Sequence, residues 1–150
     1  MSPDIAESFA ALLPRLEGID WCLFGGAATA LYLDDWRGLH DIDVLLPAAE
    51  LVGMFDRAPI VDKSDGGTER FRSAIYAGWA LPVPIDLLAG FEVNHAGAWR
   101  PVWPITRRLL PVPGGMAPVP DLAEHIEITR LLGRPRDLAR IAELQAAGIP

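Results

Sequence analysis

Two adjacent glycines constrain the fold of this chain more than any other feature. Gly25-Gly26 ends an apolar run over residues 21 to 24 and opens a helical pattern over residues 27 to 33. A glycine has no Cβ, so backbone N–H groups stay accessible at such a junction, and the N-terminus of a helix attracts anions. The sequence therefore predicts a strand, a tight turn and a helix whose N-terminus suits a phosphate.

Two acidic residues follow further along the chain. Asp41 and Asp43 alternate with apolar residues in a run that extends to Leu46, which predicts a strand over 42–46 with both carboxylates on one face. Adjacent carboxylates repel each other unless a cation lies between them, and oxygen ligands of this kind suit Mg²⁺. The pair is therefore a candidate metal site beside the candidate phosphate site.

A third acid completes this set. Asp86 lies in another short apolar run, over residues 84 to 88, which also predicts a strand. If the two strands are neighbours, Asp86 joins Asp41 and Asp43 around a pair of metal ions. Two ions about 3.5–4 Å apart can clamp the attacking and leaving oxygens of a phosphoryl displacement.

Taken in order, Gly25-Gly26, Asp41-x-Asp43 and Asp86 resemble the polymerase-beta-type nucleotidyltransferase superfamily. The resemblance is to its small prokaryotic branch, which includes toxin-like and antibiotic-modifying nucleotidyltransferases. The segment LGRPRDLARI over residues 132 to 141 is similar to one common in that branch, so the resemblance covers about residues 19 to 145.

Two positions depart from the pattern of the family. Many members carry Gly-Ser in place of Gly-Gly, and Leu39 stands where a polar residue such as threonine is usual.

The resemblance implies an α+β fold in which a small mixed β-sheet is flanked by helices and followed by two C-terminal helices. It implies that Asp41 and Asp43 bridge two Mg²⁺ ions bound with an NTP, and that Asp86 holds the ion beside the acceptor hydroxyl. Arginine is frequent in the family at the position of Arg37. This frequency favours contact between Arg37 and the triphosphate over simple solvation of the bend that contains it.

Two further arginines are candidates for phosphate contacts. Residues 69 to 76 alternate in a way that predicts a single strand with Arg70 and Arg72 on one face. Guanidinium groups suit phosphates. An exposed strand edge explains both residues equally well, so the two interpretations stay open. Trp36, in the bend before the acidic pair, is the tryptophan best placed to stack on a base.

The remaining pattern predicts one domain over residues 1–150, with a core over about 1–118 and a helical segment over about 119–150. Helices are expected over residues 4–17 and 47–55. Residues 91 to 120 are rich in proline and poor in periodicity, which predicts an irregular covering segment with at most one short strand. Asp121 with Glu124 resembles a capping box at the start of a helix, and Pro135 opens a last helix that closes at Gly148.

Composition narrows the classes of function. The 150 residues are 51% hydrophobic and 22% charged, with a net charge of −7. A protein that grips long stretches of nucleic acid would carry a basic stripe, so extended nucleic-acid binding is not expected. The first residues do not form a signal peptide, and no apolar run is long enough to span a membrane, so a cytoplasmic protein is expected. Cys22 stands alone and is expected to be a small buried residue.

Together with these features, the resemblance implies a Mg²⁺-dependent nucleotidyltransferase that moves an NMP from an NTP to an acceptor hydroxyl and releases pyrophosphate. The acceptor, whether a small molecule, a protein or a tRNA end, stays open, as do a homodimer and a partner of the toxin–antitoxin type. The alternative is a catalytically inactive nucleotide-binding or antitoxin-like interaction module with the same fold. Three unneeded carboxylates in one cleft would be destabilising, which favours the enzyme.

Overall fold

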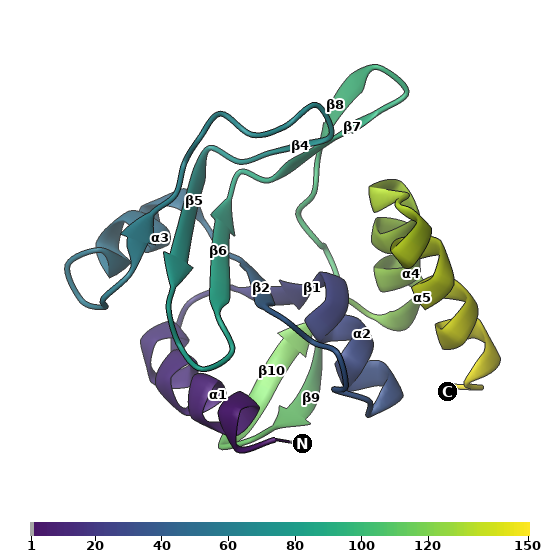
Figure 1. Ribbon diagram of the computed structural model, residues 1–150, viewed down its shortest axis with the longest axis horizontal. Coiled ribbons are helices and arrows are strands. Elements are labelled where there is room, and N and C mark those ends of the chain that lie inside the picture. Colours follow the sequence, from purple (N-terminus) through teal and green to yellow (C-terminus); the bar gives the residue numbers. More distant parts are fainter. Residues whose placement is uncertain (1) are drawn as a thin grey trace.

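The computed structural model describes residues 2–150, in which helices and strands alternate up to α3, a long run of strands follows, and two helices end the chain (Figure 1). None of the helices within this range has the length and apolar character needed to cross a bilayer. The helices are α1 (Pro3–Leu16), α2 (Gly25–Leu33), α3 (Ala48–Met54), α4 (Leu122–Leu132) and α5 (Pro135–Ala146). The strands are β1 (Cys22–Phe24), β2 (Ile42–Leu45), β3 (Val61–Asp62), β4 (Phe71–Arg72), β5 (Ile75–Trp79), β6 (Ile85–Ala89), β7 (Glu92–His95), β8 (Ala98–Pro101), β9 (Arg108–Val112) and β10 (Gly115–Val119).

The main sheet is mixed, which confirms the expected α+β class. Its strands follow the order β1-β2-β6-β5-β3, and the central pair β2–β6 is parallel while its neighbours are antiparallel. The two C-terminal helices lie side by side at one edge of the molecule, as expected (Figure 1). A smaller three-stranded sheet has the order β4-β7-β8, and β9 pairs with β10 in a two-stranded sheet.

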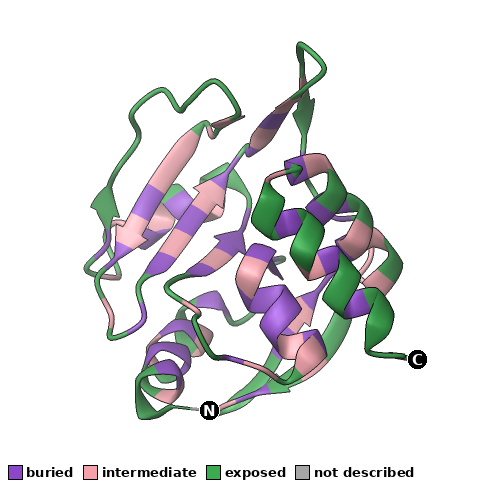
Figure 2. Cartoon of the chain, turned by 45° about the vertical axis from the view of Figure 1, so that its right-hand side comes forward, coloured by how far each residue is buried: buried purple, intermediate pink, exposed green. Residues whose placement is uncertain are grey.

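The two faces of the main sheet have different surroundings. Along β6 the residues alternate between fully buried and half-buried, and Figure 2 shows this alternation along β5 and β6. The buried face packs on α1, whose apolar stripe of Phe9, Leu12 and Leu16 is almost completely inaccessible. The half-buried face carries Asp86 and Leu88, so it is the face available for a site.

The segment predicted as one strand over residues 69–76 is in fact two strands, so that prediction was wrong. β4 pairs with β7 and β5 pairs with β6, and the two pairs belong to different sheets. The break is opposite Gly90, which has a φ of +63° and whose missing Cβ would lie 2.9 Å from the Cβ of Ala74. The long hairpin bends at this contact. Residue 90 must be a glycine there, because a side chain would be strained by the positive φ and blocked by Ala74.

The segment over residues 91–120 is also more regular than predicted, since it contains β7, β8, β9 and β10. Pro101, Pro111 and Pro118 lie within these strands. A proline cannot donate to a neighbouring strand, and it is tolerated because these two- and three-stranded sheets consist largely of edges. The prolines are therefore compatible with strands in this segment, although their number in the sequence suggested irregular structure.

The C-terminal helices begin where the sequence predicted. Asp121 caps α4 by accepting a hydrogen bond from the Glu124 backbone N–H at 2.8 Å. The full capping box is wrong, because the Glu124 carboxylate accepts instead from the backbone N–H groups of Ile105 and Thr106. A buried hydrogen bond of 2.8 Å between Thr29 Oγ1 and His125 Nε2 then fixes α4 against α2.

One buried side chain anchors α1 to the connection between β5 and β6 and gives a test of this packing. Ser8 Oγ donates to the Val83 carbonyl and accepts from the Val83 N–H, each at 2.9 Å. Ser8→Ala leaves both backbone groups buried without a partner, so we expect the free energy of unfolding to fall by about 2 kcal/mol. Urea denaturation measures the change. Glu7→Ala, at an exposed position of the same helix, is the control and should shift stability by less than about 0.5 kcal/mol. Equal effects of the two substitutions would contradict this account.

Candidate active site

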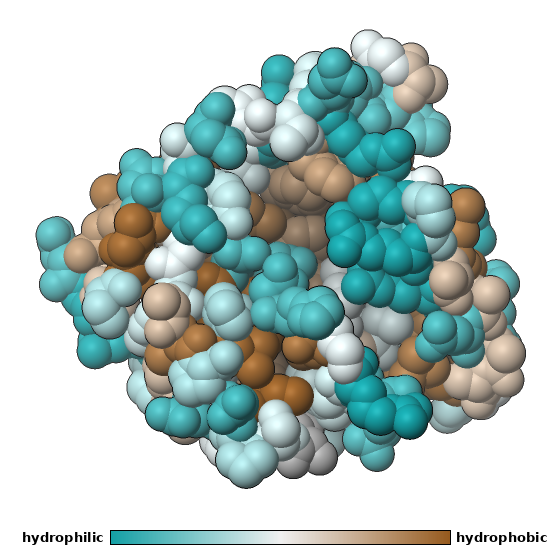
Figure 3. Space-filling model, viewed as in Figure 1, coloured by the Kyte–Doolittle hydropathy of each residue, from teal (hydrophilic) through white to brown (hydrophobic). Residues whose placement is uncertain are grey.

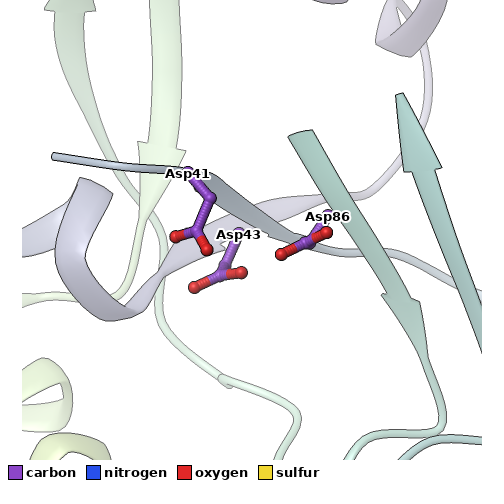
Figure 4. A group of neighbouring side chains, drawn as sticks. All are labelled: Asp41, Asp43 and Asp86. Atoms are coloured by element: carbon purple, nitrogen blue, oxygen red, sulfur yellow. The ribbon is translucent and has the colours of Figure 1, made fainter. Parts of the chain in front are cut away.

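Strand register brings the glycine pair and the acidic residues into one row. β1 and β2 are antiparallel with Phe24 opposite Asp43, and the parallel register of β2 and β6 places Asp43 beside Asp86. Gly25 follows Phe24 directly, and Asp41 lies just before β2. The three carboxylates point into the same space from adjacent strands (Figure 4).

The three carboxylates form a cluster that could hold a cation. One oxygen from each of Asp41, Asp43 and Asp86 lies within 4.8 Å of the other two. Asp41 is exposed, whereas Asp43 and Asp86 are half-buried. The Tyr76 hydroxyl donates to Oδ1 of Asp86 at 3.0 Å, which fixes one oxygen of that carboxylate. Hard oxygen ligands at this spacing suit a divalent cation such as Mg²⁺.

The pKa values of two members of the cluster, Asp43 and Asp86, are raised. Burial, followed by the negative charges of Asp41 and Asp86, raises the pKa of Asp43 to about 8, although Arg134 and Arg140 oppose the shift. Burial is also the main cause that raises the pKa of Asp86, against the hydrogen bond from Tyr76. Without a cation, a proton on Asp43 relieves the repulsion between the carboxylates.

The two glycines leave room for groups on either side of them. Gly25 has a φ of +62°, and a Cβ there would lie 3.1 Å from Asp43 Oδ2. A Cβ on Gly26 would lie 2.9 Å from Arg140 Nη2. α2 starts at this pair, its N-cap residue Phe24 offers no side-chain hydrogen bond, and its first turn contains no acidic residue. The N–H groups at this helix start are therefore available to an anion.

A cavity of about 390 Å³ joins these elements. Figure 3 shows the hollow, with a hydrophobic floor and with hydrophilic atoms gathered on the side of α4 and α5. The apolar residues that line the cavity include Phe24, Leu88 and Phe91. The charged residues that line the cavity are Asp41, Asp43, Asp65, Asp86, Arg72, Arg134, Arg136 and Arg140. Acids from the strands thus face the same space as arginines from the C-terminal segment.

Comparison with solved structures identifies the architecture. A Thermotoga maritima protein described as a candidate nucleotidyltransferase superimposes with a TM-score of 0.65 at 18% identity, covering 93% of this chain and 91% of that one. A lincosamide antibiotic adenylyltransferase, LnuA with lincomycin bound, superimposes with a TM-score of 0.56 at 11% identity, covering 93% and 94%. The chain has the nucleotidyltransferase fold. No protein-family model matches the sequence, and no curated protein matches it either.

Within the nucleotidyltransferase fold, the arginines predicted as phosphate ligands are not all beside the cavity. Arg72 lines it, while its guanidinium pairs with Glu92 at 2.9 Å. Arg37 pairs with its near neighbour Asp35 at 2.9 Å, and its side chain is 91% exposed outside the cavity lining. Arg70 Nη1 donates to the Leu132 carbonyl at 2.9 Å, at the end of α4. Of these three arginines, the structure therefore brings only Arg72 to the cavity.

Other residues of this nucleotidyltransferase fold reach the cavity without having been predicted as site residues. Arg134, Arg136 and Arg140 line it from the segment that resembled the small prokaryotic branch, and Tyr76 lines it from β5. The sequence feature that could have indicated Arg134, Arg136 and Arg140 as site residues is their spacing around Asp137. By contrast, Trp36 is buried and packs edge-on against Phe9, with ring centroids 5.8 Å apart, so it does not line the cavity.

The raised pKa of Asp43 predicts how stability depends on pH in metal-free protein. The folded state binds this proton more tightly than the unfolded chain, so the free energy of unfolding falls as pH rises from the ordinary value of 3.8 to about 8. His125 acts in the opposite sense up to pH 6.5, because burial lowers its pKa from 6.5 to about 4. Between pH 6.5 and 8 we therefore expect stability to fall, by up to about 1.4 kcal/mol per pH unit.

Chemical denaturation in the presence of a chelator, at several pH values, measures this slope. The control is Asp43→Asn, which cannot titrate and should flatten the profile over the same interval. Parallel profiles for the two proteins would contradict the assignment of the slope to Asp43.

Proposed function

We propose that this protein is a nucleotidyltransferase that moves an NMP from an NTP to an acceptor hydroxyl and releases pyrophosphate. The observation that carries the proposal is the cluster of Asp41, Asp43 and Asp86 within 4.8 Å, in a cavity that also contains a bare helix start and several arginines. Carboxylates suit divalent cations, whereas N–H groups and guanidiniums suit phosphates. An NTP with a bound cation would use both kinds of group, since the carboxylates would bind the cation and the N–H groups and guanidiniums would bind the phosphates.

The proposed metal is Mg²⁺, in a two-metal arrangement. Asp41 and Asp43 would hold both ions and Asp86 would hold the one beside the acceptor. Ions bound there would stabilise the charge that develops on the phosphoryl oxygens and favour deprotonation of the acceptor hydroxyl. Tyr76 orients Asp86 through its hydrogen bond to Oδ1. The N–H groups at Gly25 and Gly26 would bind phosphate oxygens, and the apolar lining that includes Phe91 would exclude water from the reacting groups.

The acceptor is a separate matter from the nucleotide. One structural neighbour is an adenylyltransferase that acts on a lincosamide antibiotic, which supports ATP as the first NTP to test. The net charge of −7 supports a small molecule or a limited macromolecular surface rather than an extended nucleic acid. We therefore propose an acceptor that presents a single hydroxyl at the mouth of the cavity near Asp86.

Calorimetric titration with ATP, GTP, CTP and UTP in excess Mg²⁺ tests this proposal. We expect the wild type to bind at least one NTP in a Mg²⁺-dependent manner. Asp41→Asn/Asp43→Asn should lose that binding, because it removes two of the three anionic ligands. The matched control is Asp4→Asn/Asp56→Asn, which makes the same change in charge at exposed positions and should bind as the wild type does.

Two results would count against the enzyme. If no NTP binds to the wild type, the proposal fails. If an NTP binds equally well to the wild type and the Asp41→Asn/Asp43→Asn variant, the acids do not hold a metal that the nucleotide needs. That second result would favour the inactive nucleotide-binding module with the same fold.

A further inference from the structure

A buried carboxylate behind the cavity has more partners than its place in the helix requires. Asp137 is in the first turn of α5 and is completely inaccessible to solvent. Its Oδ2 accepts from the Arg134 backbone N–H at 3.0 Å, and this one bond is enough to cap the helix. The same carboxylate also accepts from two guanidinium groups, which helix capping does not explain.

Arg134 is held on two sides. Its Nε donates to Asp137 Oδ2 at 2.6 Å and its Nη2 donates to Oδ1 at 3.1 Å, which is the bidentate geometry of a strong guanidinium–carboxylate pair. The guanidinium also lies 5.1 Å from the centre of the Phe71 ring. Its side chain nevertheless keeps 27% of its surface exposed, and it lines the cavity. An arginine restrained in this way loses little further freedom when it binds an anion.

Arg140 is held by the same carboxylate and directed toward the start of α2. Its Nη1 lies 3.3 Å from Asp137 Oδ1, and its Nη2 is the atom that a Cβ on Gly26 would meet at 2.9 Å. The guanidinium therefore occupies the space that the second glycine leaves open. Its charge is close enough to Asp43 to oppose the rise in the pKa of that carboxylate. One positive group thus lies beside the helix start and acts on the acidic cluster.

We propose that Arg134 and Arg140 bind the phosphates of the nucleotide, and that Asp137 is the positioning residue that holds both guanidiniums toward the cavity. This inference rests on the proposed function, because it assumes that the cavity holds a polyphosphate. Asp137 does not touch the ligand and acts only through the two arginines. A fully buried charge is costly unless it is well paired, and here the pairing fixes the direction of two donors.

Binding of inorganic tripolyphosphate in excess Mg²⁺ tests the inference without the base or the acceptor. We expect Asp137→Asn to weaken binding by about tenfold or more, since the bonds it loses are charge-assisted. Arg134→Gln/Arg140→Gln should weaken binding at least as much. The triple variant should match this double variant within about twofold, because effects that act through one group are not additive. Binding of Mg²⁺ alone should be unchanged by Asp137→Asn.

The inference is overturned if Asp137→Asn binds tripolyphosphate as the wild type does. It is also overturned if Asp137→Asn costs the same factor in the Arg134→Gln/Arg140→Gln background, since Asp137 would then act by another route. Either result, together with normal Mg²⁺-dependent NTP binding by the wild type, leaves the proposed function standing. If the wild type binds neither NTP nor tripolyphosphate, both proposals fail.

A second variant keeps the test decisive if circular dichroism shows that Asp137→Asn does not fold. Gly26→Ala displaces the flexible end of Arg140 without altering Asp137, and alanine suits a helix. We expect it to fold and to weaken tripolyphosphate binding. Gly53→Ala is the matched control in α3, where the new Cβ would lie 3.4 Å from Arg57 Nη2, and it should bind as the wild type does. Wild-type binding by Gly26→Ala would overturn the role of Arg140.

Discussion

Repulsion between carboxylates on adjacent strands is the constraint on which the rest of the site depends. The parallel pairing of β2 and β6 fixes Asp43 beside Asp86, and backbone hydrogen bonds prevent the two from moving apart. Burial strengthens the repulsion, since the pKa of Asp43 rises to about 8. The hydrogen bond that the Tyr76 hydroxyl donates to Asp86 and the positive charges of Arg134 and Arg140 offset part of this repulsion. A divalent cation would complete this neutralisation, and a bound triphosphate would bring that cation with it.

Long-range contacts hold the two C-terminal helices, α4 and α5, against α2. The hydrogen bond between Thr29 and His125 fixes α4 against α2, and the Tyr32 hydroxyl reinforces this contact by donating to the Pro120 carbonyl at 2.7 Å. α5 packs on α4 and also contacts α2, which returns the arginine-bearing turn to the glycine pair. Gly26 is part of this closure, because its missing side chain makes room for Arg140. The same glycine therefore serves the packing of the C-terminal helix and the accessibility of the helix start.

The sequence predicted the elements whose signals are local, and it failed where contacts between distant residues decide the structure. Alternation was enough to find the strands that carry the acids, and Pro135 marked the start of α5. The break between β4 and β5 depends on the contact between Gly90 and Ala74, which no local pattern contains. Among the arginines, Arg37 is paired within its own bend. Those of the C-terminal segment were not predicted as site residues, because they reach the cavity only through the packing of α5 on α4 and α2, which no local sequence pattern contains.

The most direct test of the central claim is a crystal structure with Mn²⁺ and a non-hydrolysable NTP analogue, read by anomalous scattering. The account predicts manganese bound by Asp41, Asp43 and Asp86, with the triphosphate between the metal and the guanidiniums of Arg134 and Arg140. The helix start at Gly25 and Gly26 should lie against a phosphate. A nucleotide bound away from the three carboxylates, or manganese absent from them at full nucleotide occupancy, would contradict it.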